Sequence, residues 1–217
     1  MRITYYLEVV SSWCHWAEPT WAELKARYAG RVQFDWKIAL MRPQDFPVSP
    51  AQADWFYRRS GTIARSPYML NHGWFETPGC DYATPNLVAE AARSLGATSD
   101  TARLALTHAA VREGRKINRL DEAVAIAAAA GNLDPAELRA RATSADIRAA
   151  VDASTAAFHA LQITQRPAFV LDDAIGDRAV FSGLIRIEPL AATIEAMLAD
   201  TAAYATHRAH FGDPPAS

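Results

Sequence analysis

The sequence predicts an α/β protein in which a single β-sheet is interrupted by a large, all-helical insertion. Strand-like segments occur only near the two ends of the 217-residue chain. The long middle part is rich in alanine, and its apolar residues recur at helical spacing. A chain of this length builds one good hydrophobic core more readily than two. One interrupted sheet therefore explains the pattern better than two domains in series.

The N-terminal part of the chain predicts a strand, a helix and a second strand. Residues 2–10 are rich in β-branched and aromatic types, which favours a strand. Good helix formers follow over residues 17–28, and Ser11 or Ser12 can cap that helix. Residues 32–40 alternate at period two, which indicates another strand. Three elements in so short a stretch form a βαβ unit.

The middle of the chain divides into a proline-rich and an alanine-rich part. Residues 43–85 contain six prolines and many aromatic residues, which predicts ordered loops and a short helix covering a pocket. Residues 86–161 predict five helices by their apolar spacing and their start signals. We expect these at residues 87–95, 100–112 and 120–130, and from residues 134 and 144 onward.

Strand character returns near the C-terminus. Residues 168–171 and 179–181 are apolar and separated by a short polar turn, which predicts two strands. A last amphipathic helix is expected over residues 188–198, with a continuation to about His210. The residues from 212 onward should be frayed.

Composition excludes several classes of function. The formal net charge is -2, so neither nucleic acid nor an anionic membrane is an expected partner. No apolar run reaches the roughly 18 residues that span a bilayer, and no secretory signal precedes the first strand, so we expect a cytoplasmic protein. Cys14 and Cys80 are then expected to be thiols. The histidines are scattered, which predicts no metal site.

The segment from Ser11 to Cys14 follows a strand directly and opens a helix. The free N–H groups and the dipole at a helix N-terminus stabilise an anion, so Cys14 is a candidate for a stabilised thiolate. An alternative is equally good on these residues alone. Ser11 would then only cap the helix, and Cys14 would be a small buried hydrophobic residue.

A proline stands at the head of the first C-terminal strand. Proline lacks a ladder donor and is tolerated at a strand start or edge. Together with the first motif, Pro167 and the residues around it resemble the cis-proline strand of the thioredoxin superfamily, which faces the active-site helix. Residues 113–118, 132–138 and 181–183 resemble the matching passages of DsbA-like proteins with a large helical insert.

This resemblance covers residues 3 to 200 and implies a DsbA-type, thioredoxin-like fold. It implies a thioredoxin-like core made of residues 1–50 and 160–200. Residues 51–159 would form a loop-plus-helical insertion, and residues 201–217 a helix extension and tail.

The first motif departs from the two-cysteine pattern of that family. DsbA-like oxidoreductases carry Cys-x-x-Cys, and Ser11 stands at the position of the attacking cysteine, so a two-cysteine cycle cannot run within the motif. Cys80 could replace that thiol only if the fold brings it close. A serine at this position resembles 2-hydroxychromene-2-carboxylate isomerases and kappa-class glutathione transferases. The resemblance implies that Ser11 stabilises the glutathione thiolate and that the backbone of Gln165 or Arg166, beside Pro167, pairs with the tripeptide.

Two further features bear on the thiol. Where the serine-type relatives carry a Ser-Asp pair for the γ-glutamyl end, this chain has Ser182 and Gly183. These two stay candidates for cofactor binding, because a hydroxyl and nearby helix N–H groups can hold a carboxylate. Cys14 has no counterpart in the serine-type relatives and is either a redox handle or inert.

Arg166 and several aromatic residues are candidates for the substrate pocket. A charged residue just before Pro167 could point toward Ser11 and bind a substrate carboxylate, and a guanidinium reaching into solvent is equally good. For Arg58, Arg59 and Arg65 a solvated basic face is favoured over anion binding. His15 could act as a general base near neutral pH, although adjacent helical residues point apart. The aromatic pocket candidates are Trp13, His15, Trp16, Trp55 and Trp74.

These residues predict an enzyme that uses a low-molecular-weight thiol, with glutathione as the expected cofactor. It would isomerise or conjugate a small unsaturated or aromatic carboxylate. Two alternatives stay open. One is a monothiol, DsbA-like thiol–disulfide oxidoreductase using Cys14, and the other is a non-catalytic thioredoxin-fold binding module. The expected partner is a small-molecule substrate, and a homodimer stays open.

Overall fold

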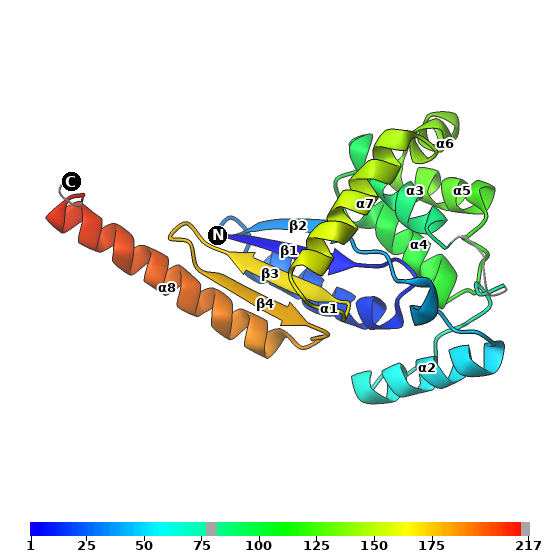
Figure 1. Ribbon diagram of the computed structural model, residues 1–217, viewed down its shortest axis with the longest axis horizontal. Helices are drawn as coiled ribbons and strands as arrows, with labels where there is room; N and C mark the ends of the chain where they lie inside the picture. Colours follow the sequence, from blue (N-terminus) through cyan, green and yellow to red (C-terminus); the bar gives the residue numbers. More distant parts are fainter. Residues whose placement is uncertain (77–81, 214–217) are drawn as a thin grey trace.

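Four strands from the two ends of the chain form one mixed sheet in the order β2-β1-β3-β4 (Figure 1). The computed structural model describes residues 1–76 and 82–213. Strand β1 (Arg2–Leu7) runs parallel to β2 (Gln33–Ile38) and antiparallel to β3 (Ala168–Asp172), which pairs with β4 (Arg178–Ser182). The α/β fold with a helical insertion, predicted from the sequence, is confirmed.

Within the described residues the α-helices α2 to α7 all lie between β2 and β3 in the chain. The α-helices are α1 (Ser12–Arg27), α2 (Pro50–Ala64), α3 (Thr84–Ser94), α4 (Thr101–Val111), α5 (Leu120–Gly131), α6 (Pro135–Ala142), α7 (Ala145–Ala160) and α8 (Ile187–Phe211), and a short 3-10 helix spans Pro43–Asp45.

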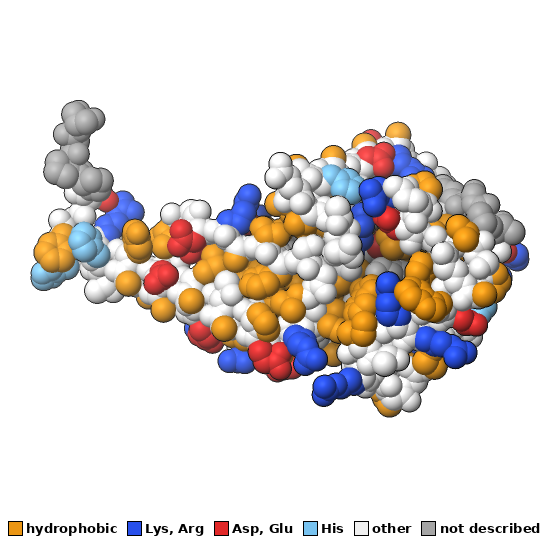
Figure 2. Space-filling model, turned by 60° about the horizontal axis from the view of Figure 1, so that its bottom comes forward, with side chains coloured by type: hydrophobic (Ala, Val, Ile, Leu, Met, Phe, Trp, Pro, Cys, Tyr) orange, Lys and Arg blue, Asp and Glu red, His pale blue; other side chains and the backbone are white. Residues whose placement is uncertain are grey.

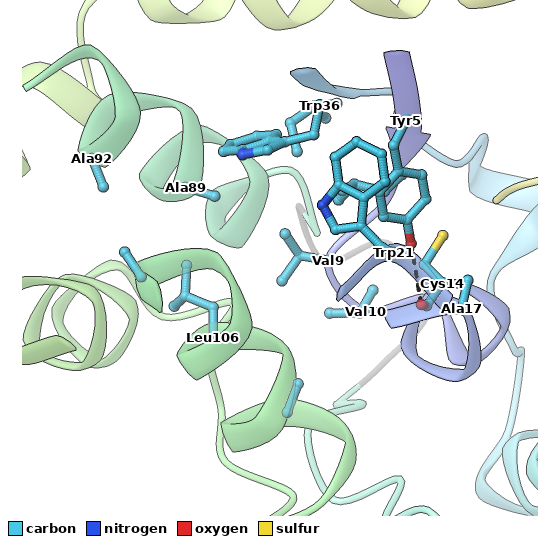
Figure 3. Packing of buried hydrophobic residues seen from close by; sticks show 14 of the residues in the cluster. Tyr5, Val9, Val10, Cys14, Ala17, Trp21, Trp36, Ala89, Ala92 and Leu106 are labelled. Carbon is cyan, nitrogen blue, oxygen red and sulfur yellow. Dashed lines mark hydrogen bonds between the residues drawn. The ribbon is translucent and has the colours of Figure 1, made fainter. Parts of the chain in front are cut away.

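Helices pack on both faces of the sheet, and successive residues of β1 meet different helices because they point to opposite sides. Tyr5 stacks on Phe169 at 4.9 Å between ring centroids and meets Trp21 of α1 at 5.2 Å. The next residue, Tyr6, meets Phe158 of α7 on the other face at 5.8 Å. Figure 3 shows Tyr5 and Trp21 packed against each other, with the start of α1 beside them.

The helical insertion shares the main core and supports the start of α1. Ala89 and Ala92 of α3 and Leu106 of α4 are buried in the same cluster as Cys14 and Trp21 (Figure 3). Small residues on α3 allow its neighbours to approach closely, so the helices α3 to α6 stand together at one end of the sheet (Figure 1). The segment that carries Ser11 and Cys14 is therefore packed against both the sheet and the helical insertion.

The proline-rich part of the chain differs from the sequence-based expectation. The proline-rich part was expected to hold only a short helix, yet α2 has 15 residues. Ser49 caps it by accepting a hydrogen bond from the N–H of Gln52 at 3.2 Å, and Pro50 occupies the first turn, where its missing N–H costs nothing. The prolines thus mark a helix start. Helix α8 continues to Phe211, close to the expected end near His210, and its last turns project from the body (Figures 1 and 2).

Candidate functional site

The candidate site lies where β1 ends, α1 begins and β3 starts. Ser11 has extended backbone angles and is the N-cap of α1. The Arg166–Pro167 peptide bond is cis and directly precedes β3. A cavity of about 360 Å³ is bounded by the first residues of α1, residues 164–166, residues 41–47 and α2. Its lining residues are Val10, Ser11, Ser12, Trp13, Met41, Arg42, Gln44, Asp45, Pro47, Ala53, Phe56, Tyr57, Arg59, Trp74, Thr164, Gln165 and Arg166.

Ser11 brings a hydroxyl group to the wall of this cavity. Its oxygen accepts a hydrogen bond from the N–H of Cys14 at 3.3 Å, as an N-cap does. The backbone N–H groups of Ser12 and Trp13 have no hydrogen-bond partner among the described residues. A hydroxyl that can rotate and two free N–H groups at the positive end of a helix make a setting that favours a bound anion.

Cys14 differs from the expectation of a stabilised thiolate. Its side chain is 2% exposed, and it packs in the core beside Tyr5 and Ala17 (Figure 3). Burial raises the pKa of the Cys14 thiol to about 11, although the Ser11 hydroxyl and the N–H of Glu8 act in the opposite direction. Desolvation of the anion outweighs the helix dipole, so the expected low-pKa thiol is wrong and the buried hydrophobic alternative holds.

Glu8 is a buried acidic group beneath the site that sequence reasoning did not single out. The side-chain amide of Asn86 donates to one carboxyl oxygen of Glu8 and accepts from the N–H of Val9 at 3.0 Å. Burial raises the pKa of the Glu8 carboxyl to about 7. The available signal was an acidic residue at the end of an otherwise apolar strand.

Arg166 takes neither of the two orientations expected from the sequence. Its side chain is only 7% exposed. The guanidinium donates to the backbone carbonyls of Ala39 and Leu40 and, at 3.4 Å, to that of Thr164. It also lies 4.5 Å from the ring centre of Phe158. Carbonyls just after β2 lack ladder partners, so Arg166 satisfies them and is not available to a substrate carboxylate.

The backbone of Gln165 and Arg166, for which pairing with the tripeptide stays a prediction, lies at the cavity beside the cis peptide bond. No backbone hydrogen bond to Arg166 is made within the described residues, and both Gln165 and Arg166 line the cavity. An extended ligand can therefore pair with this backbone beside the cis Pro167.

The five aromatic pocket candidates separate into two groups. Trp13 and Trp74 line the cavity, and the indole N–H of Trp74 donates to the Tyr57 hydroxyl. His15 and Trp16 lie outside the lining, because successive helical residues point about 100° apart. His15 lies 3.1 Å from the Tyr68 hydroxyl, measured from its Nε2 atom.

His15 and Trp55 therefore depart from their predicted roles. Burial lowers the pKa of His15 to about 4, so the neutral ring is a weak base near pH 7. It also lies outside the cavity lining, and both observations contradict the expected general base. Trp55 is 57% exposed and is not part of the lining. It lies instead beneath the guanidinium of Arg59, 4.8 Å from its carbon to the ring centre.

Ser182 and Gly183 support the loop that carries the cis peptide bond. The Ser182 hydroxyl donates to the carbonyl of Gln165 at 3.3 Å, and the N–H of Gly183 donates to the carbonyl of Pro167 at 2.7 Å. Gly183 has φ +77, which favours glycine. Both lie outside the cavity lining, and their role as cofactor ligands stays a prediction.

Other predictions concern metal, membrane and the second cysteine. Among residues 1–76 and 82–213 no group of histidine, cysteine and acidic side chains is arranged to hold a metal ion. None of the helices in that part of the chain is long and apolar enough to cross a membrane. Cys80, considered as a replacement for the missing thiol, lies outside the described residues.

Known structures share this arrangement of sheet and helices. A putative protein disulfide isomerase from Nitrosomonas europaea superposes with a TM-score of 0.75 at 15% identity, covering 92% of this chain and 98% of that one. The cytosolic disulfide reductase DsbM from Pseudomonas aeruginosa gives 0.70 at 20% identity, covering 91% and 98%, and its structure with GSH gives 0.69 at 19%, covering 91% and 99%. A 2-hydroxychromene-2-carboxylate isomerase gives 0.64 at 13% identity, covering 94% and 99%.

At such identities these likenesses show the fold alone. A comparison with curated proteins finds no match. The model of one protein family, the DSBA-like thioredoxin domain, matches residues 2–195, which is most of the chain. The β1–α1–β2 unit, the cis proline before β3 and the helical insertion agree with that match, and the chain belongs to the DSBA-like thioredoxin domain family.

Proposed function

We propose that this protein is an enzyme that uses glutathione, or another low-molecular-weight thiol, to isomerise or conjugate a small unsaturated or aromatic carboxylate in the cytoplasm. One observation carries the proposal. Ser11, Ser12 and Trp13 at the positive end of α1 line the same cavity as Arg166. The N–H groups of Ser12 and Trp13 and the backbone of Arg166 have no hydrogen-bond partner within the described residues. The likeness to DsbM with GSH and to an isomerase of 2-hydroxychromene-2-carboxylate supports it.

The residues around the cavity fit a bound thiol. Ser11 would donate a hydrogen bond to the sulfur, and the positive end of α1 would lower the pKa of the bound thiol further. The backbone of Arg166 would pair with the extended tripeptide and keep the sulfur at Ser11. When bound, the thiolate supplies a nucleophile that adds reversibly to a conjugated double bond, which permits rotation before the bond to sulfur breaks again.

The burial of Cys14 weighs against the monothiol alternative. A mixed disulfide requires thiolate attack from an accessible sulfur, whereas the Cys14 sulfur lies in the core and its thiol keeps its proton at neutral pH. We therefore expect Cys14 in the folded protein to react slowly with iodoacetamide at neutral pH and quickly after unfolding. Rapid alkylation of the folded protein would revive the oxidoreductase alternative.

A calorimetric titration of glutathione into the wild-type protein and into Ser11→Ala tests the proposal. We expect saturable binding that is about ten-fold or more weaker in the variant, since a hydrogen bond to a charged group contributes roughly 1.5–3 kcal/mol. Ser144→Ala is the matched control, because Ser144 caps α7 in the same way, at 3.4 Å from the N–H of Ile147, and lies outside the cavity lining.

The control separates a lost helix cap from a lost ligand contact. If Ser144→Ala binds glutathione like the wild type while Ser11→Ala does not, the hydroxyl acts on the ligand. Equal binding by Ser11→Ala and wild type, or no binding by either protein, contradicts the proposal. A screen of unsaturated acids for turnover then separates an enzyme from a binding module.

A further inference from the structure

The cavity has three arginines in its wall, and two of them are already engaged by the protein. Arg42 makes an ion pair with Asp45, with 3.1 Å between Nη2 and Oδ1 and a second contact from Nε at 3.3 Å. The Arg166 guanidinium donates to three backbone carbonyls, as described above. Both cations thus have their donors directed at partners within the chain.

Arg59, the third arginine, has no ion pair and no side-chain hydrogen bond within the described residues. It extends from α2, where Ala53, Phe56 and Tyr57 also line the cavity. Its guanidinium carbon lies 4.8 Å from the ring centre of Trp55 and 5.4 Å from that of Phe56. Stacking engages the face of a guanidinium and leaves the N–H groups at its edge free.

The remaining walls suit a flat, apolar ring. Trp13 and Trp74 line the cavity together with Phe56 and Tyr57. The carboxylate of Asp45, which also lines it, is neutralised by Arg42. A planar ligand with one negative group therefore meets aromatic surface along its ring and, in Arg59, a cation whose planar fork matches a carboxylate.

We infer that Arg59 is the residue that selects ligands carrying a carboxylate, and that it binds this group of a small aromatic acid at the α2 wall of the cavity. The inference deepens the proposed function and rests on the same cavity. It replaces Arg166, which the sequence suggested for this role. Trp55 is then a positioning residue that holds the guanidinium of Arg59.

Calorimetric titration with a matched pair of ligands tests the inference without any turnover. The ligands are 3,5-dinitrobenzoate and its uncharged analogue 3,5-dinitrobenzamide, titrated with and without glutathione. For Arg59→Gln we expect binding of the acid to weaken about ten-fold or more while binding of the amide stays unchanged, because only the charged contact is lost. Arg59→Lys keeps the charge without the fork and should lie between the two.

Arg58→Gln is the control variant. Arg58 is the neighbouring arginine on α2, it is exposed, and it lies outside the lining. The substitution removes the same charge at nearly the same place, so it measures the long-range effect of charge on the acid. Equal weakening by Arg58→Gln and Arg59→Gln, or equal affinity of wild type and Arg59→Gln for the acid, overturns the inference.

A second titration distinguishes the substrate from the thiol as the source of the carboxylate, because glutathione has carboxylates of its own. Wild type and Arg59→Gln are titrated with glutathione and with its glycyl ethyl ester. We expect Arg59→Gln to bind both like the wild type. The opposite result would be that Arg59→Gln binds glutathione more weakly than the wild type does, but binds the ester and the aromatic acid with wild-type affinity. That result would assign Arg59 to the tripeptide and overturn our assignment.

The two proposals can fail separately. If glutathione does not bind the wild type but the acid binds in an Arg59-dependent manner, the proposed function fails and the role of Arg59 stands. If glutathione binds through Ser11 but the acid and the amide bind alike in all variants, the role of Arg59 fails and the thiol site stands.

Discussion

Two regions contain charged side chains: the layer formed by Glu8, Glu18 and Arg103 around α1, and the α2 wall of the cavity. The charged side chains of the layer have polar partners within the protein, whereas Arg59 on the α2 wall has none among the described residues. In the layer around α1, Glu18 and Arg103 form an ion pair with each other, and Glu8 accepts a hydrogen bond from the side-chain amide of Asn86. On the α2 wall, Arg59 has aromatic neighbours and no counter-ion among the described residues. A buried charge without a partner destabilises the fold. A charge at the edge of a cavity stays solvated, so it needs no partner in the protein and can bind a ligand.

The ion pair of Arg103 shows the first case in detail. Arg103 on α4 is 1% exposed and donates to both carboxyl oxygens of Glu18 on α1, at 2.5 and 2.9 Å. It also lies 3.2 Å from Asp100. The Glu18 carboxylate in turn accepts a hydrogen bond from the Tyr5 hydroxyl at 3.2 Å. This network joins the helical insertion to the helix that carries the candidate site.

The largest effect is therefore expected when this pair is broken. Arg103→Met leaves the Glu18 carboxylate without its main partner and should cost about 3–5 kcal/mol of unfolding free energy, measured by urea unfolding. Arg31→Met is the control, because Arg31 forms an exposed pair with Glu195 at 3.2 Å that contributes under about 1 kcal/mol. Similar losses in the two variants would remove the contrast between buried and exposed charges.

A pH-dependent effect is expected at Glu8, the buried acid of the same layer. Its pKa is raised by burial from 4.5 to about 7, so the folded state keeps a proton that the unfolded chain has lost. The contribution of protonated Glu8 to the free energy of unfolding is fully present below about pH 4.5 and is lost as the pH rises through about 7. The total loss is up to about 3 kcal/mol, at roughly 1.4 kcal/mol per pH unit. Glu8→Gln should flatten the dependence of unfolding free energy on pH over this window. If the unfolding free energies of wild type and Glu8→Gln change with pH in parallel, this role of Glu8 is contradicted.

The smallest changes in unfolding free energy are expected for two arginines of the same cavity, Arg166 and Arg59. Arg166→Met leaves the carbonyls of Ala39 and Leu40 without donors and should cost about 1–3 kcal/mol. Arg59→Gln should stay within about 0.5 kcal/mol of the wild type, because Arg59 has no such partner. Thermal unfolding of both variants gives the ranking. A loss for Arg59→Gln as large as that for Arg166→Met would show that Arg59 is structural as well.

Much of the fold was predictable because its signals are local. The βαβ unit, the strand after Pro167 and the helices of the insertion each follow from periodicity and start signals within a few residues. Helix α2 was underestimated, because the prolines around Ser49 and Pro50 indicate a loop unless one of them is recognised as a helix start.

The candidate site was predictable only in part. Ser11, Trp13 and the loop at Gln165 line the cavity as expected, because a strand end, a helix start and a strand start place them there. His15 and Trp55 do not, since a rotation of one residue along a helix turns a side chain to another face. Arg59 was assigned to a solvated basic face, and no pattern in the sequence distinguishes it from Arg58.

By itself, the sequence determined the order of the strands and helices, the serine at the start of α1 and the proline at the start of β3. The tertiary structure decided the protonation and the partners of the charged and reactive groups. Cys14 has a raised pKa because the core surrounds it, and Arg166 is engaged because β2 ends beside it. Backbone preferences act between near neighbours in sequence, whereas desolvation and pairing depend on residues brought together from distant parts of the chain.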